Sequence, residues 1–173
     1  MVRWLSPILS FTSEEVWQNL PGKRAESVFL ETWFEVKSEE YRSQAIETAR
    51  EINVHIRKQL ELMRSEKIIG SSLDAEVTIY CSQNIYDELS SFGDELRFLF
   101  ITSYATIENI DKKGNDSAEV SDDVYLSVKK SDHEKCVRCW HHREDVGSDK
   151  NHPELCGRCI ENVSGIGETR NFA

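Results

Sequence analysis

The sequence predicts an α+β chain that ends in a small zinc ribbon. Three observations lead to this fold class. Over residues 41–63, apolar side chains recur every three or four positions, as one face of a long helix requires. Later in the chain, apolar and polar residues alternate in three short stretches, as they do in half-buried strands. Near the end, cysteines stand in two tight pairs, Cys136 with Cys139 and Cys156 with Cys159.

The opening residues predict a helix that is broken early. Pro7 interrupts an apolar stripe, and proline is tolerated only near a helix start or at a kink. The stripe consists of Trp4, Leu5, Ile8 and Leu9. Thr12 followed by Glu15 resembles a capping box that would begin a second helix. Pro21 then ends that helix.

A loop and the long helix follow. Residues 22–37 are expected to form a loop with a short extended piece at 28–30, and Trp33 and Phe34 to pack back on the first helices. The apolar face of the long helix would contain Tyr41, Ala45, Ile46, Ala49, Ile52, Ile56, Leu60 and Met63. Gly70 suits a left-handed cap beyond its end. The sequence therefore predicts a helical part over residues 1–70.

Residues 71–131 predict a small mixed α/β domain. The expected strands are 77–81, 104–108 and 125–129. Residues 85–92 have a helical pattern, and Asp94 as a cap favours a second helix over 96–101. The polar stretch 111–123 is expected to be a mobile loop. Cys81 ends the first strand and is interpreted as a small buried apolar residue.

The remaining residues, 132–173, are expected to form the zinc ribbon. Each cysteine pair encloses two residues, and sixteen residues separate the pairs, which is the spacing of a four-thiolate zinc site. Cys136, Cys139, Cys156 and Cys159 would complete a tetrahedron with no open position, so the ion would be structural. Two disulfides, a redox pair and an iron–sulfur cluster are weaker alternatives. Five thiols without an apolar signal segment or membrane span favour a reducing cytoplasm.

Composition restricts nucleic-acid binding to local patches. The formal net charge of −10 argues against a strong, indiscriminate nucleic-acid binder. Arg138 and Arg158 would either offset the negative charge of a zinc–thiolate site or reach RNA phosphates. Trp140 would either form the core of the ribbon or offer a stacking platform for an unpaired base, and we favour stacking.

A second basic surface is possible on the long helix. Arg50, Arg57 and Arg64 recur every seven residues and therefore share one stripe. They are either solvated charges, which is the default interpretation, or a ridge that follows RNA phosphates. The acidic pairs diverge in direction, and the chain has no Gly-rich phosphate loop, so no catalytic residue is predicted.

Taken together, these motifs resemble the carboxy-terminal end of bacterial isoleucyl-tRNA synthetases, class I enzymes of the Ile/Val/Leu group. The likeness runs over essentially the whole chain. The segments that carry it are 3–12, 15–17, 67–75, 94–98, 135–141, 145–147, 156–159 and 167–173. The cysteine motif alone is less specific, because a similar finger closes the formamidopyrimidine-type DNA glycosylases.

The resemblance implies a role in tRNA charging. It implies that the helices are a remnant of an anticodon-binding bundle and that the chain grips the anticodon stem-loop of isoleucine tRNA. Activation of isoleucine with ATP would occur in parts of a cytoplasmic, monomeric parent that this sequence lacks. The chain would be a fragment, inactive alone, whose residues Trp4, Leu5, Ile8 and Trp17 form an exposed apolar patch. The alternatives are a DNA-binding finger of the glycosylase type and a purely structural zinc tail.

Overall fold

The computed structural model describes residues 1–33 and 43–170. The chain divides into two compact units, Met1–Tyr41 and Arg42–Ala173. Among the described residues, no helix combines the length and the apolar character that crossing a bilayer would need.

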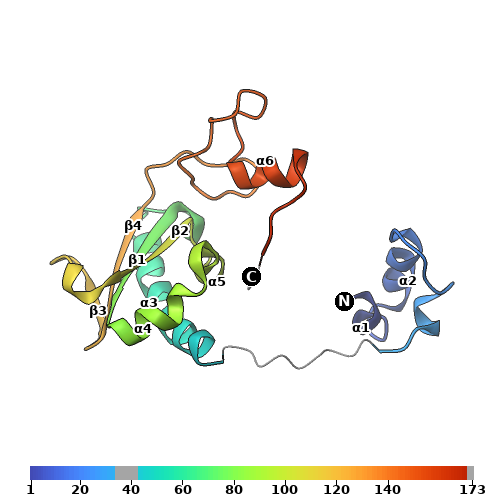
Figure 1. The fold of residues 1–173 in the computed structure, drawn as a ribbon, viewed down its shortest axis with the longest axis horizontal. Helices are drawn as coiled ribbons and strands as arrows, with labels where there is room; N and C mark the ends of the chain where they lie inside the picture. The colour runs from blue at the N-terminus through green and yellow to red at the C-terminus, as the bar shows by residue number, and fades with distance from the viewer. Residues whose placement is uncertain (34–42, 171–173) are drawn as a thin grey trace. The chain divides into compact units, whose positions relative to one another are not determined.

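The first unit contains two short helices, as the broken apolar stripe predicts. Helix α1 spans Val2–Leu5 and helix α2 spans Ser10–Asn19 (Figure 1). The expected capping box is wrong, because Thr12 lies inside α2. The connection between the helices stays nearly helical, with the Leu9 amide donating to the Leu5 carbonyl at 2.8 Å, so the second helix begins before Thr12.

Residues Val28–Leu30 form a 3₁₀ helix and not the expected extended piece. The Ser27 hydroxyl caps this turn by accepting from the Phe29 amide at 3.2 Å. The Glu14 carboxylate accepts from the Val28 amide at 3.0 Å and so ties the turn to α2. Trp33 is 65% exposed, so the prediction that it packs back is wrong. Phe34 lies outside the described residues.

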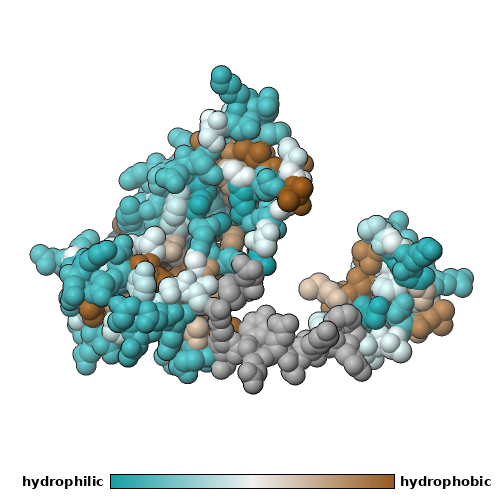
Figure 2. All heavy atoms as spheres, in the orientation of Figure 1, coloured by the Kyte–Doolittle hydropathy of each residue, from teal (hydrophilic) through white to brown (hydrophobic). Residues whose placement is uncertain are grey.

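The exposed apolar patch is confirmed for three of its four expected members. Trp4, Leu5 and Ile8 are exposed, and Figure 2 shows apolar surface on this unit. Trp17 is instead buried, because its indole N–H donates to the Ala25 carbonyl at 3.0 Å. The Arg24 guanidinium lies 5.6 Å from the Trp17 ring centre and covers it further.

The second unit begins with the long helix α3, Ser43–Ser65. Its predicted apolar face is confirmed, with buried residues Ala45, Ala49, Ile52, Ile56 and Leu60. Tyr41 lies outside the described residues. The left-handed residue after α3 is Lys67, with a φ of 60°, and not Gly70 as expected. The Ile68 amide donates to the Met63 carbonyl at 2.9 Å, which completes a Schellman turn before Gly70 is reached.

A four-stranded mixed sheet follows, in the order β2-β1-β4-β3 (Figure 1). Its strands are β1 Ala75–Cys81, β2 Tyr104–Asn109, β3 Ala118–Ser121 and β4 Val124–Lys130. Strand β1 pairs in parallel with β2 and antiparallel with β4, whereas β3 pairs only with β4. Strand β3 corrects the sequence analysis, which expected 111–123 to be a loop. Alternate residues of β1 are buried, as the alternating pattern predicts.

Two helices connect β1 to β2, namely α4 Gln83–Ser90 and α5 Leu96–Phe100. Both predicted helices are therefore present. Asp94 does not cap α5 but lies in a 3₁₀ turn, Gly93–Glu95, and its carboxylate binds the Arg97 guanidinium at 2.8 Å.

Buried residues of α3, α4, α5, β1 and β4 form one core cluster. Cys81 is fully buried in this core, and burial raises the pKa of its thiol to about 11. Because the core joins the apolar face of α3 to the sheet, packing does not separate the helix from the strands. The division at residues 1–70, 71–131 and 132–173 stays a prediction.

Candidate metal centre and nucleic-acid interface

The first cysteine pair lies in a tight turn closed by a short bridge between Lys135 and His142. The Cys136 amide donates to the His141 carbonyl at 2.9 Å, and the Trp140 amide donates to the Cys136 carbonyl at 2.9 Å. Trp140 has a φ of 66°, a left-handed conformation that is uncommon for a large residue. This backbone turn directs both thiols of the pair to the same side.

The second pair leads into helix α6, Gly157–Ser164, which begins directly after Cys156 and contains Cys159 in its first turn. The Gly157 amide donates to the Asp145 carboxylate at 2.8 Å. A β-carbon at position 157 would lie 2.7 Å from that carboxylate, so a larger residue there would displace the carboxylate from the amide. The Val137 amide donates to the Glu154 carbonyl at 3.1 Å and holds the two turns together.

The four sulfur atoms of these pairs gather within 4.8 Å of one another. Zinc–sulfur bonds of about 2.3 Å in a tetrahedron place neighbouring sulfurs about 3.8 Å apart. The observed separation between the sulfurs of Cys139 and Cys156 is 3.7 Å. The donor set therefore fits a tetrahedral metal ion. Within the described residues, no histidine belongs to the cluster.

Close packing of the sulfurs also shifts the pKa values of these thiols. The contact between the sulfurs of Cys139 and Cys156 lowers the pKa of Cys139, whereas the same contact and burial raise the pKa of Cys156. One sulfur is thus readily anionic while its neighbour retains a proton. A bound divalent cation would replace the remaining protons, because a cysteine binds zinc as a thiolate and not as a thiol.

Arg138 and Arg158 have different surroundings although both precede the second cysteine of a pair. The Arg138 guanidinium donates to the sulfur of Cys159 at 3.6 Å, which agrees with its interpretation as an offset for thiolate charge. The Arg158 guanidinium binds the Glu168 carboxylate at 3.2 Å and is 20% exposed. Burial opposes its charge, but Glu168 and then the sulfurs of Cys139 and Cys159 raise the pKa of Arg158, so this arginine also offsets thiolate charge. Contact of either arginine with RNA stays a prediction.

Trp140 does not form the core of the ribbon. Its side chain is 62% exposed, whereas the buried cluster consists of Cys136, Cys156 and Cys159 with Val146 and Leu155 packed against them. An exposed indole next to the exposed residue Arg138 agrees with the stacking interpretation, which stays a prediction.

The arginines of α3 form the predicted stripe. Arg57 and Arg64 line one pocket of 280 Å³, and Arg50 and Arg57 line the adjoining pocket of 300 Å³. Arg50 binds Glu47 at 2.8 Å, and Arg64 binds Glu61 at 2.6 Å. These surface ion pairs are weak and leave the guanidinium groups accessible. Their role in RNA binding stays a prediction.

Comparison with known proteins assigns both parts of the chain. The family model described as "Anticodon-binding domain of tRNA ligase" matches residues 1–79, and that described as "Zinc finger found in FPG and IleRS" matches residues 134–162. The isoleucine–tRNA ligase of Ruthia magnifica subsp. Calyptogena magnifica is 57% identical over the whole chain. Those of Nitrosococcus oceani and Alkalilimnicola ehrlichii are 50% and 44% identical, again over the whole chain. The chain belongs to the isoleucine–tRNA ligase family.

The chain spans 19% of the length of these isoleucine–tRNA ligases and corresponds to their carboxy-terminal part. The zinc-finger description names two protein groups, so that match alone does not separate them. The match of residues 1–79 to an anticodon-binding domain does, and the alternative of a glycosylase-type DNA-binding module is not favoured.

In this family member, contacts that sequence reasoning missed attach the zinc-finger region to the sheet. The Asp74 carboxylate accepts from the amides of Gly70 and Ser71 at 3.0 and 2.8 Å. Its other oxygen lies 3.3 Å from the His142 imidazole and 3.5 Å from the Lys135 ammonium group. The His142 amide also donates to the Ser103 hydroxyl at 2.6 Å. Ser71 and Asp74 form a local capping box, but the contacts with His142, Lys135 and Ser103 join residues far apart in the sequence and exist only in the folded chain.

We expect Asp74→Asn to destabilise this attachment by about 1–3 kcal/mol, the range for loss of a charged acceptor with several donors. Burial opposes ionisation of Asp74, but amide donors and Lys135 lower its pKa below the ordinary value. The stabilisation is therefore present above about pH 3.9 and lost as pH falls through the lowered pKa. Hydrogen exchange at pH 7 should accelerate in residues 133–143. Asp132→Asn, at an exposed position, is the control, and equal exchange in both variants would contradict the prediction.

Proposed function

We propose that this chain is the tRNA-binding carboxy-terminal part of an isoleucine–tRNA ligase and that it grips the anticodon stem-loop of isoleucine tRNA. The observation that carries the proposal is the pairing of an anticodon-binding match over residues 1–79 with the zinc-finger match over 134–162 in one chain. ATP-dependent charging of the tRNA would be performed by the remainder of a monomeric, cytoplasmic synthetase.

The metal in this proposal is one structural zinc ion held by Cys136, Cys139, Cys156 and Cys159. Three observations support it. The four sulfurs lie within 4.8 Å of one another, the sulfurs of Cys139 and Cys156 are 3.7 Å apart, and three of the four cysteines are buried. When bound, zinc supplies the cross-link that fixes the two turns, and four thiolates leave it no open position for substrate. The residues of the ribbon then present their exposed side chains in a fixed arrangement.

RNA contact in this proposal uses the exposed face of the first turn. Trp140 would stack on an unpaired base of the anticodon loop, and Arg138 would contact a phosphate once zinc satisfies the thiolate charge. The arginines of α3 and Arg158 are further candidates for phosphate contacts. Because the chain has a net charge of −10, binding should be weak at physiological salt and should be measured at low ionic strength.

We expect Trp140→Ala to weaken tRNA binding by about 5- to 150-fold, the effect of losing one base–aromatic stack. Filter binding of the zinc-loaded chain to isoleucine tRNA measures this. Val163→Ala is the control, because Val163 is 53% exposed and lies outside both the anticodon-binding match and the turn that contains Trp140. Unchanged affinity in Trp140→Ala with zinc retained would instead favour a purely structural zinc tail.

A competition experiment tests the choice of nucleic acid. In this experiment, labelled isoleucine tRNA is bound to the zinc-loaded chain, and unlabelled competitors are added. Unlabelled isoleucine tRNA should displace it at a lower concentration than duplex DNA of equal length. Preference for the duplex would overturn the tRNA-binding proposal in favour of a glycosylase-type module.

A further inference from the structure

A cavity of 430 Å³ lies beside α5, where the 3₁₀ turn before that helix faces the zinc-finger region and the segment after α6. Its volume is within the usual range for ligand sites, which is about 300–1,000 Å³. Arginine side chains from four places in the sequence line it: Arg97, Arg143, Arg158 and Arg170. None of them belongs to the proposed stacking surface at Trp140.

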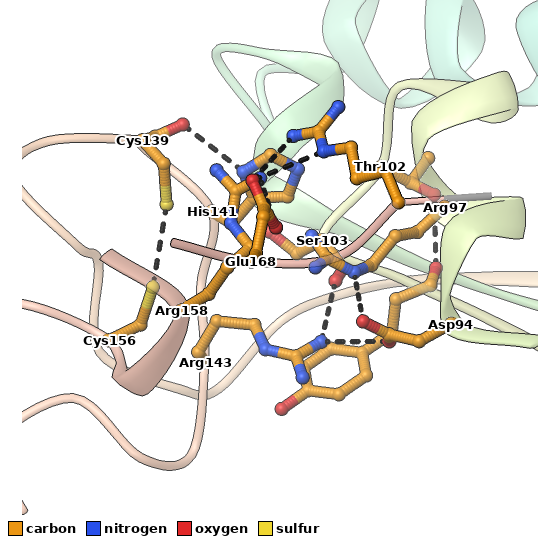
Figure 3. Close-up of polar contacts among 12 residues, drawn as sticks. Asp94, Arg97, Thr102, Ser103, Cys139, His141, Arg143, Cys156, Arg158 and Glu168 are labelled. Atoms are coloured by element: carbon orange, nitrogen blue, oxygen red, sulfur yellow. Dashed lines mark hydrogen bonds and ion pairs between the residues drawn. The ribbon is translucent and has the colours of Figure 1, made fainter. Parts of the chain in front are cut away.

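Two carboxylates form ion pairs with these four guanidinium groups. Asp94 lies 2.8 Å from Arg97 and 3.5 Å from Arg143, and Figure 3 shows both arginines pointing toward it. Glu168 lies 3.2 Å from Arg158 and 3.1 Å from Arg170.

The other two acidic residues on the cavity wall are Asp145 and Glu95. Asp145 already accepts the Gly157 amide. The cavity lining therefore contains as many acidic side chains as arginines. An anion that enters must exchange with one of these carboxylates.

Arg158 also lies against an aromatic ring. Its guanidinium lies 5.1 Å from the centre of the Phe98 ring, while Arg97 and Arg170 lie 4.1 and 4.2 Å from the same ring. Phe98 thus makes cation–π contacts with three guanidinium groups. The Arg158 Nε atom is buried and has no hydrogen-bond partner within the described part of the chain. A buried donor without a partner is costly unless an incoming group satisfies it.

We propose that this cavity binds a phosphate group, carried by the tRNA backbone, and that the Glu168 carboxylate occupies the phosphate's place on Arg158 in the free chain. The inference rests on the proposed tRNA-binding function and adds a specific contact to it. Phosphate and carboxylate both match the planar fork of arginine. A phosphodiester and a carboxylate each carry one negative charge, so the exchange leaves the balance of the cavity unchanged.

The location of Glu168 allows its carboxylate to be displaced from Arg158. Its side chain is 23% exposed, and it lies in the segment after α6, outside any helix or strand. The Glu168 amide donates to the Asn162 side chain at 3.2 Å, which keeps the backbone in place while the carboxylate rotates away. Phosphate oxygens would then accept from Arg158, including its unpartnered Nε.

The test compares Glu168→Gln with Glu119→Gln, which removes the same charge from an exposed position on β3. Glu168→Gln keeps the side-chain shape but no longer competes for Arg158. Affinity of the zinc-loaded chain for isoleucine tRNA at low salt should rise about twofold to fivefold beyond the Glu119→Gln control, as expected for a partly exposed ion pair. An affinity equal to the control, or a lower one, would mean that Glu168 merely positions Arg158, and would overturn the inference.

A double-mutant cycle assigns the effect to Arg158. In an Arg158→Gln background, Glu168→Gln should change affinity no more than Glu119→Gln does, and the slope of log affinity against log salt should fall by about 0.9 for one lost phosphate contact. Zinc content and circular dichroism check the fold of each variant. A Glu168→Gln effect that persists without Arg158 contradicts the exchange.

Inorganic phosphate separates this inference from the proposed function. Titration of the wild-type chain, followed by NMR, should shift the Nε–H signal of Arg158, and Glu168→Gln should lower the phosphate concentration required. If phosphate shifts the signal but tRNA does not bind, the tRNA-binding proposal fails while the anion site stands. If tRNA binds and Arg158 responds neither to tRNA nor to phosphate, the cavity proposal fails alone.

Discussion

Removal of zinc should unfold the ribbon while the sheet stays folded. The buried cluster of the ribbon consists of Cys136, Cys156 and Cys159, with little apolar area beside them. The sheet has a separate core that contains α3, α4 and α5. Structural zinc contributes about 10–16 kcal/mol in peptide zinc fingers at neutral pH, more than so small a cluster could replace.

Hydrogen exchange measures this effect by segment. With zinc bound, amides such as those of Cys136 and Trp140, which donate within the first turn, should be protected. After a chelator is added, residues 134–162 should exchange at the rate of an unfolded chain, whereas β1 should keep its protection. Equal protection of the ribbon with and without the chelator would contradict the proposed metal centre.

Substitution of a cysteine should have the same effect without a chelator. Cys159→Ser is expected to abolish tight zinc binding, because serine cannot supply the fourth thiolate. Cys81→Ala provides the matched control, since Cys81 is equally buried but lies in the core of the sheet. Elemental analysis should find one zinc per chain in the control and none in Cys159→Ser. Retention of zinc by Cys159→Ser would remove that residue from the ligand set.

Local sequence patterns predicted the strand and the helix in which buried positions repeat at regular intervals. Strand β1 is buried at every second position, and α3 is buried along one face, so both were evident in the sequence. Strand β3 was missed because it is a four-residue edge strand within a polar stretch, paired with β4 and contributing Val120 to the core. The left-handed cap after α3 was misplaced at Gly70 because Lys67 adopts the conformation usually taken by glycine.

In the candidate site, too, local patterns were predictable from the sequence and contacts between distant residues were not. The spacing of the four cysteines is a local signal and predicted a cluster that the structure brings together. The contacts by which Asp74, Ser103 and Arg143 join the zinc-finger region to the sheet carry no such signal, because each spans 39 to 68 positions of the sequence. Trp17 was misassigned for a related reason, since its burial depends on Arg24 and on the Ala25 carbonyl beyond the end of α2.

The second large effect is expected from Ile56→Ala on α3. Ile56 is fully buried in the cluster that also contains Ile79 of β1 and Leu126 of β4. Truncation of a buried isoleucine to alanine removes apolar contacts and leaves a cavity, which costs about 2–5 kcal/mol. We therefore expect the free energy of unfolding of this unit to fall by that amount, measured by native-state hydrogen exchange on the zinc-loaded chain.

Leu62→Ala on the same helix is the control, because Leu62 is 53% exposed and alanine has high helix propensity. Its effect should stay within about 0.5 kcal/mol. In Ile56→Ala, amides of α3 and of β1 should lose protection together, because a helix and a sheet that share one core unfold as one cooperative unit. Loss of protection in α3 alone would mean that the helix is energetically separate from the sheet, as a domain boundary near residue 70 requires. A joint loss would instead place the boundary before α3, where the two compact units divide.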